Sequence, residues 1–271
     1  MQPSNQNLEQ INYSALVSLS DYKKILKFTF KRWPLYAWLN VALIILILIS
    51  VAFQVITAIY LIAIPLILSA RATTKFKDSR WLQFAADNGW LVGSADETLS
   101  LPPSLENLGH SAHFSPVVNA VINGFHCYLY EYNYTVGYGR SSQTFYATIA
   151  DFLANTALPP FILDAKMKNS THGHNPSNYK KLDLEGDFNK YFQLYVPKGD
   201  EIDALTILTP DVMQTLIANN QTEDVETAGN SSFVIANYDR RDAASLPSLL
   251  ASFVVLTSQI VEQIHVPETS V

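Results

Sequence analysis

The residues from Trp33 to Ala70 read WPLYAWLNVALIILILISVAFQVITAIYLIAIPLILSA, and none of these 38 residues is Asp, Glu, Lys, Arg or His. Basic residues flank the stretch on both sides: Lys23, Lys24, Lys27, Lys31 and Arg32 before it, and Arg71, Lys75, Lys77 and Arg80 after it. A long uncharged apolar run between basic flanks is typical of a membrane-spanning segment. The sequence therefore predicts an integral membrane protein of the cell membrane.

The length of this stretch bears on the number of crossings. One helical crossing needs about 20 apolar residues, so a single helix over the whole run would be roughly 57 Å long. Lys and Arg accumulate on the cytoplasmic side of a membrane, and a helical hairpin would keep both basic flanks there. We predict a transmembrane hairpin of two short helices over residues 33–72 with a turn near 50–54. One long tilted helix is the alternative.

The charge balance changes after the apolar stretch. Residues 81–271 hold nine basic and 21 acidic residues, a net charge of −12. Such a domain repels nucleic-acid phosphates, which proteins bind through Lys and Arg. The partners we expect are the lipid bilayer for the spans and a protein partner for the acidic domain, with no nucleic acid. Cys127 is the only cysteine, so no intramolecular disulfide can form.

The chain divides into three expected parts. Residues 1–32 form a loose tail and a basic amphipathic helix, residues 33–72 form the transmembrane region, and residues 78–266 form a soluble domain. With a hairpin the protein is multi-pass and the soluble domain lies in the cytoplasm. We predict a membrane-anchored α+β fold, in which the hairpin precedes a soluble antiparallel sheet with helices.

The clearest strand is FHCYLYEYNY, from Phe125 to Tyr134. Because strand side chains alternate between faces, one face of it carries His126, Tyr128, Tyr130, Tyr132 and Tyr134. Residues 143–153 are expected to return as its partner strand. Four tyrosines bring a large apolar area, so we predict that a helix of the same domain covers them and that they form no open binding platform.

Further elements follow from local signals. Thr209-Pro210-Asp211 predicts a helix that runs to about Asn219, since Thr can cap it and Pro fits its first turn. The last helix is expected to begin near Asp242 or Ser245 and to reach Ile264. It is too polar to suit lipid as a third span, so we interpret it as a core helix. We predict strands over 161–167, 182–186, 191–196 and 231–238, a short helical turn over 117–121, and an acidic loop over 221–230.

Three short stretches together resemble a family of uncharacterised bacterial membrane proteins. They are Leu182-Asp-Leu-Glu-Gly-Asp-Phe188, Phe192-Gln-Leu-Tyr195 and Leu205-Thr-Ile-Leu-Thr-Pro-Asp-Val-Met213. In that family a pair of N-terminal spans precedes a soluble domain. The resemblance implies an architecture only, because the family has no known activity or catalytic residues.

The histidines are the main candidates for chemistry. His110 and His113 lie near Ser111 and Ser115, but no Gly-x-Ser-x-Gly elbow accompanies them. His126 and Cys127 are neighbours on a strand and therefore face opposite sides, which excludes a direct thiolate–imidazole pair.

Metal binding has two weak candidates. His172 and His174 share a polar loop, with Asp164 and Asp183 near in sequence only, and a zinc site needs three or four ligands. Asp183, Glu185 and Asp187 alternate onto one face but lack the loop of a calcium site. The sequence assigns no catalytic, cofactor-binding or metal-binding residue.

Two functions fit these observations. The first is a non-enzymatic, membrane-anchored binding or scaffolding protein that displays its acidic α+β domain at the inner membrane face. The alternative is a membrane-tethered hydrolase with an unrecognised site built on His110, His113 or His126. A cleft holding two of these histidines and a carboxylate would favour the enzyme.

Overall fold

The structure is a computed structural model, and it describes only part of the chain. The described residues are 3–16, 38, 41–46, 48, 76, 78–93, 99–166, 177–184, 186–219, 223–236 and 246–265. The chain forms two compact units, one of Met1–Asn12 with Ala85–Val271 and one of Tyr13–Phe84. The first unit contains the sheet and most of the described side chains.

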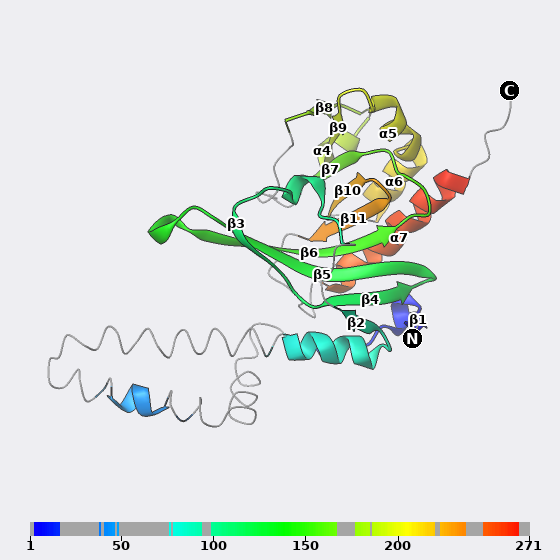
Figure 1. Cartoon of the computed structure of the whole chain (residues 1–271). Helices are drawn as coiled ribbons and strands as arrows, with labels where there is room; N and C mark the ends of the chain where they lie inside the picture. Colours follow the sequence, from blue (N-terminus) through cyan, green and yellow to red (C-terminus); the bar gives the residue numbers. More distant parts are fainter. Residues whose placement is uncertain are drawn as a thin grey trace, which may run out of the picture. The chain divides into compact units, whose positions relative to one another are not determined.

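Eleven strands of the described residues form one mixed sheet (Figure 1). Its main path runs β1-β4-β5-β6-β11-β10-β7-β9-β8, while β2 pairs with β4 and β3 pairs with β5. The β1–β4 pairing is parallel, and the other pairings are antiparallel. The strands are β1 Asn5–Gln6, β2 Leu91–Gly93, β3 His110–Phe114, β4 Val117–Ile122, β5 Phe125–Val136, β6 Gln143–Leu153, β7 Phe161–Ala165, β8 Tyr179–Leu182, β9 Phe192–Pro197, β10 Asp224–Ala228 and β11 Ser231–Ala236.

The long helix of this unit packs against two central strands of the sheet. Helix α7 contacts β11 and β6, and its residues Leu249, Leu250 and Phe253 are buried. Helix α6 begins as expected, because the Thr209 side chain accepts a hydrogen bond from the Val212 amide at 3.4 Å. The helical elements are η1 Leu8–Gln10, η2 Pro103–Leu105, η3 Gly139–Ser141, α4 Phe188–Tyr191, α5 Glu201–Ile207, α6 Pro210–Ala218 and α7 Leu246–His265.

The predicted fold class is wrong. In place of a membrane-anchored α+β fold with a transmembrane helical hairpin, the structure shows a mixed eleven-stranded sheet with helices. Among the residues that the structure describes, no helix is long and apolar enough to cross a membrane. This finding also overturns the predictions of a transmembrane helix and of a multi-pass protein of the cell membrane. Most of residues 33–72, including the predicted turn at 50–54, lie outside the described residues, as do residues 17–32.

The local predictions had mixed outcomes. Strand β5, its partner β6 and helices α6 and α7 are confirmed at or near their expected bounds. The helical turn expected over 117–121 is wrong, because these residues form β4 and pair with β5. The acidic loop expected over 221–230 is wrong too, since it contains β10, which lies between β11 and β7. The first residues of the chain were expected to be a loose tail, but residues 5–6 form strand β1, which pairs with β4.

Candidate functional site

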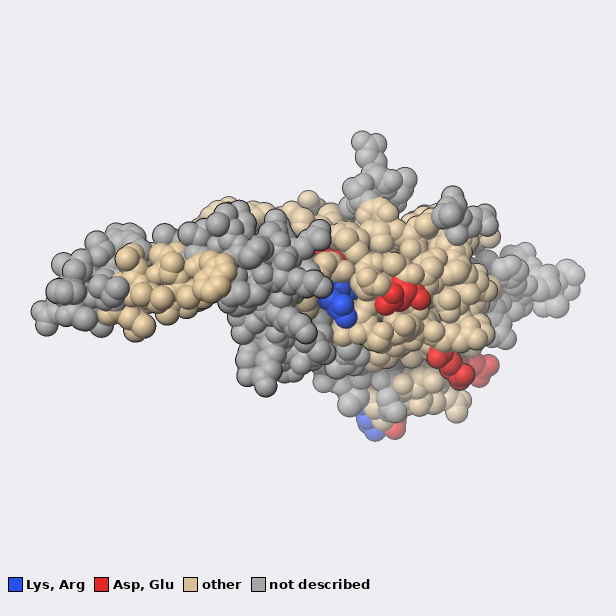
Figure 2. All heavy atoms as spheres, turned by 90° about the horizontal axis from the view of Figure 1, so that it is seen from below, with Lys and Arg blue, Asp and Glu red and all other residues tan. Residues whose placement is uncertain are grey.

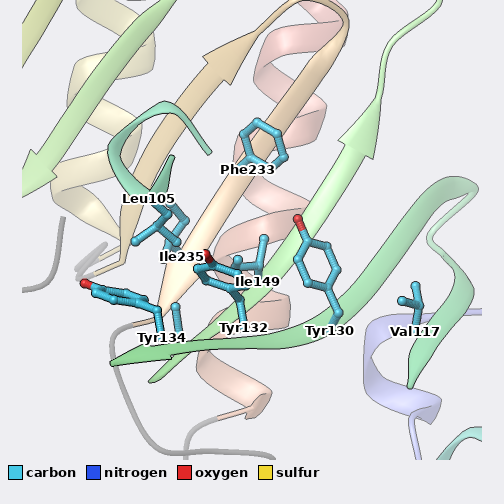
Figure 3. Packing of buried hydrophobic residues seen from close by; sticks show 9 residues of the cluster. Leu105, Val117, Tyr130, Tyr132, Tyr134, Ile149, Phe233 and Ile235 are labelled. Carbon is cyan, nitrogen blue, oxygen red and sulfur yellow. The ribbon is translucent and has the colours of Figure 1, made fainter. Parts of the chain in front are cut away.

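Three of the four tyrosines on one face of β5 are buried, and their cluster of described residues includes none from α6 or α7. Tyr130, Tyr132 and Tyr134 are 0%, 3% and 2% exposed, which confirms that they form no open platform. Their cluster is closed by Leu105 of η2, with no residue of α7 in it (Figure 3). The expected helical cover is therefore wrong. We call residues 99–108 the strap and the sheet face beneath it the tyrosine face.

The middle of the strap is held by a buried carboxyl group. Ser104 lies in η2, and its amide donates to Oε2 of Glu226 at 2.9 Å. The Ser104 hydroxyl donates to Oε1 of the same carboxyl group. Glu226 is on β10, and only 1% of it is exposed. Both oxygens of a buried carboxyl group thus bind a single strap residue.

The beginning of the strap, at Ser100, is linked to a second carboxyl group through Ser231. The Tyr130 hydroxyl donates to the carbonyl oxygen of Ser100 at 3.1 Å, and the Ser100 and Ser231 hydroxyls are 3.0 Å apart. Ser231 in turn donates to Oδ2 of Asp151 at 3.5 Å. Asp151 is 1% exposed, and its Oδ1 has no hydrogen-bond partner within the part of the chain that the structure describes.

The sheet register places both carboxyl groups on the tyrosine face. Phe233 of β11 pairs with Asp151 of β6 on one side and with Glu226 of β10 on the other. Two strand spacings separate the carboxyl-bearing residues, roughly 10 Å between backbones. The two carboxyl groups therefore act as separate anchors on either side of one phenylalanine. Across the described residues, no three His, Cys, Asp or Glu side chains are grouped so that they could hold a metal ion.

Burial changes the acidity of these groups. Desolvation raises the pKa of Glu226 to about 8, although its hydrogen bonds to Ser104 act in the opposite direction. Desolvation also raises the pKa of Asp151 to about 7, against the bond from Ser231. The pKa of Tyr130 lies well above its usual value because of burial and then the charge of Asp151. Burial thus favours the neutral forms of these carboxyl groups and of the tyrosine, whereas the Ser104 and Ser231 bonds favour the ionised carboxylates.

A second feature is an arm formed by the distal parts of β3, β5 and β6, which extends beyond the rest of the sheet (Figure 1). Aromatic rings stiffen it. The ring centroids of Phe114 and Tyr132 are 5.0 Å apart, those of Tyr132 and Tyr134 are 5.9 Å apart, and those of Tyr134 and Phe145 are 5.5 Å apart. These contacts fix the direction of the arm by packing.

The tip of the arm exposes apolar side chains. Tyr138 is 79% exposed and Val136 is 43% exposed. The His110 ring stacks on Tyr138 with centroids 4.5 Å apart, and its Nε2 is 2.8 Å from the carbonyl oxygen of Gly137. Arg140 is exposed in the adjoining turn. The tip therefore presents an oriented aromatic ring, and an exposed cation follows two residues later in the chain.

The predicted histidines do not gather into one site. His110 and His113 pair with Thr135 and Asn133 near the tip of β5, whereas His126 pairs with Val121 at its other end. Asn133 lies seven positions along the strand from His126, a distance of roughly 23 Å. His110 contacts Ser111, Gly137 and Tyr138. The structure therefore offers no observation that favours the hydrolase alternative.

The remaining predicted groups are also separate. Cys127 is buried on the face opposite the tyrosines. His172, His174 and Glu185 lie outside the described residues. Strand β8 ends at Leu182, so Asp183 and Asp187 do not share a strand face. They pair instead with Lys181 at 3.4 Å and Lys190 at 2.7 Å.

Sequence reasoning missed the three residues that anchor the strap, namely Ser104, Asp151 and Glu226. A usable signal existed for two of them. Asp151 lies within the correctly predicted strand 143–153, and Glu226 alternates with Val225 and Thr227 in a short stretch. A carboxyl group at an inward-facing position of a strand is unusual unless it is paired or neutral. Such a position therefore predicts a hydrogen-bond partner elsewhere in the fold.

Among the coloured residues of Figure 2, charged side chains are sparse. In Figure 2 the Lys and Arg side chains of the coloured residues occur singly, and the Asp and Glu side chains form small separate groups.

No protein-family model matches the chain, and no curated protein matches it. Among solved structures, the chain is similar to the crystal structure of the mycobacterial trehalose monomycolate transport factor A, TtfA, at 13% sequence identity. The match covers 68% of this chain and 94% of that chain, with a TM-score of 0.48. Similarity at this level carries no argument about function.

Proposed function

We propose that the chain is a non-enzymatic protein-binding module that contacts its partner through the tip of the arm. The exposed ring of Tyr138, oriented by the His110 stack on a packed arm, carries this proposal. Tyrosine is enriched at the energetic centres of protein interfaces because it buries a large area and loses little side-chain entropy. A rigid arm adds to this by lowering the ordering cost of binding.

The chemistry of the tip indicates the kind of partner surface. Tyr138 and Val136 suit an apolar pocket, and Arg140 next to them suits carboxylates at the rim of that pocket. The partner we propose is therefore a folded protein with an apolar pocket bordered by Asp or Glu.

Photo-crosslinking in the native cell tests the proposal. A benzophenone amino acid replaces Tyr138 in one variant of the full chain and Ile202 of α5 in the matched control, since both side chains are 79% exposed. We expect a discrete protein adduct from position 138 and none from position 202. Equal adducts at both positions, or none at either, would contradict the proposal.

The affinity for the captured protein then tests the energetic role of the ring. We expect Tyr138→Ala to weaken binding by about 30-fold, the effect of losing roughly 2 kcal/mol at an interface centre. Ile202→Ala should leave the affinity unchanged. An unchanged affinity for Tyr138→Ala would mean that the tip is near the interface without contributing to it.

A further inference from the structure

The N-terminal residues of the chain add a strand to an edge of the sheet. Strand β1, residues 5–6, pairs in parallel with residues 121–122 at the end of β4 (Figure 1). The Asn123 amide continues this pairing, because it donates to the carbonyl oxygen of Gln6 at 2.9 Å. Parallel strands cannot be joined by a tight turn, so the chain that connects them is long. We propose that the same edge binds the N-terminal segment, residues 4–12, of a second copy of the chain, so that two copies exchange this segment.

Two asparagine side chains of the sheet unit bind the main chain of the segment. Buried Asn88 accepts a hydrogen bond at Oδ1 from the Asn12 amide at 2.7 Å, and its Nδ2 donates to the Asn12 carbonyl oxygen at 3.0 Å. Asn123 Oδ1 accepts from the Leu8 amide at 2.9 Å. A side-chain amide that binds both main-chain groups of one residue replaces one step of strand pairing. The edge therefore binds this segment as it would bind a peptide.

Two side chains of the segment add selectivity for its own sequence. The Ser4 hydroxyl donates to the carbonyl oxygen of Asn88 at 2.6 Å and to that of Gly89 at 3.1 Å. Gly89 leaves room for this contact, because a Cβ atom there would lie 2.5 Å from the Ser4 hydroxyl oxygen. Asn5 Oδ1 accepts a hydrogen bond from the Gly124 amide at 3.0 Å. Every copy of the chain carries a segment of this sequence, which is why the partner is a second copy.

The segment is held mainly by hydrogen bonds, and this lowers the cost of its release. Within residues 4–12, all of which the structure describes, Ile11 alone is buried. Water replaces such hydrogen bonds at a small net free energy, and terminal segments of this kind open locally in native proteins. Two copies that exchange the segment form every one of these bonds again without any new interface.

The connectivity of the chain allows the segment to change partner. The segment belongs to the same compact unit as Ala85–Val271, but residues 13–84 of the other unit separate the two along the chain. Closing so long a connection costs entropy, and the effective concentration of the segment at its own edge falls with the length of that connection. A second copy offers the same edge without this closure. We therefore expect the fraction of exchanged dimers to rise with protein concentration.

Disulfide trapping between two variants of the full chain tests the exchange. One variant carries Asn5→Cys and the other Val121→Cys, at paired positions whose Cα atoms lie about 5 Å apart, within the range of a disulfide. After mild oxidation of the mixture, we expect mass spectrometry to find a disulfide between positions 5 and 121, and such a bond joins two different copies. Asn119→Cys is the matched control for Val121→Cys, because residue 119 is more exposed on the same strand but pairs with β2. No bond to position 121, or an equal yield from position 119, would overturn the proposal.

A complementation experiment measures the same exchange at equilibrium. The pair Ser4→Ala and Asn5→Ala weakens the segment and leaves the edge intact. The pair Asn88→Ala and Asn123→Gly weakens the edge and leaves the segment intact, and glycine suits position 123 because Asn123 has a φ of 50°. Only the mixture of the two chains combines an intact segment with an intact edge on different copies.

Sedimentation equilibrium of the two chains, alone and mixed, gives the result. We expect the dissociation constant of the mixed pair to be roughly 30-fold below that for self-association of either chain, the effect of two hydrogen bonds. Equal association in all three samples would overturn the proposal. The trapping variants keep the Asn88 contacts, so the trap remains decisive if Asn88→Ala does not fold. Because Ile122 pairs with Phe125 at the start of β5, this edge is separate from the arm, and the outcome is independent of the crosslinking result.

Discussion

Tyr134 of β5 and Phe145 of β6 are direct cross-strand partners, and their rings stack with centroids 5.5 Å apart and planes at 30°. The pair lies where the arm leaves the rest of the sheet. Burial raises the pKa of Tyr134 to about 12, which keeps its hydroxyl neutral. Most of the stiffness that we attribute to the arm depends on such pairs.

Tyr134→Ala should therefore lower the free energy of unfolding by about 3 kcal/mol, because it removes a buried ring and leaves a cavity. Tyr138→Ala is the matched control. Tyr138 is mostly exposed, so its loss should change stability by less than about 0.5 kcal/mol. Urea unfolding followed by circular dichroism measures both values. Similar losses in the two variants would mean that the buried ring contributes little to the arm.

The glycine before β3 should be much less replaceable than the glycine between β4 and β5. A Cβ atom at Gly109 would lie 2.2 Å from the carbonyl oxygen of Thr135, whereas one at Gly124 would meet nothing within 4 Å. Both have positive φ, so both substitutions carry backbone strain of about 1 kcal/mol. Gly109→Ala must in addition displace β5.

Thermal unfolding of the two alanine variants separates these contributions. We expect Gly109→Ala to lower the melting temperature clearly more than Gly124→Ala does. Equal shifts would show that the close approach to Thr135 relaxes without cost.

The hairpin could be predicted from sequence because its signal is local. The alternation of Phe125 to Tyr134 and of its partner strand needs no knowledge of distant residues. Strand β10 could not be predicted in this way. Its residues are acidic and polar, and they form a strand because β11 and β7 flank them.

The cover of the tyrosine face shows the same limit. The two prolines at 102 and 103 predict a loop. The structure has a loop there, with one turn of 3-10 helix in it. The sequence does not predict that this loop covers the tyrosine face. The loop is held there by the hydrogen bond between Ser104 and Glu226, which are far apart in the sequence. The turn expected over 117–121 was wrong although Val117, Val118 and Val121 favour strands, because pairing with β5 decides the conformation of this short stretch.

The single thiol should report on unfolding. Cys127 is 0% exposed, and burial together with the charge of Asp151 raises the pKa of its thiol well above the usual value. The thiolate, which is the reactive form, is therefore both hidden and scarce. We expect the native chain to resist a thiol reagent and the chain in denaturant to react fully.

A chain with Ser141→Cys at the exposed tip provides the positive control, because its new thiol should react at once. Rapid modification of Cys127 in the native chain would show that the sheet opens locally at β5.

Asp151 should make the protein less stable as the pH rises toward neutrality. Its pKa is about 7 in the folded chain and near 3.8 when unfolded, so the unfolded state releases this proton at lower pH. The stabilisation is complete below about pH 4 and is lost as the pH approaches 7.

The substitution Asp151→Asn should remove this loss of stability. Between pH 4 and pH 7 the variant should therefore gain stability relative to the unmodified chain by about 1.4 kcal/mol per pH unit. Asp183→Asn, at an exposed and solvated carboxylate, should show no such trend. Chemical unfolding at several pH values measures both differences, and a constant difference for Asp151→Asn would mean that Asp151 stays ionised in the folded chain.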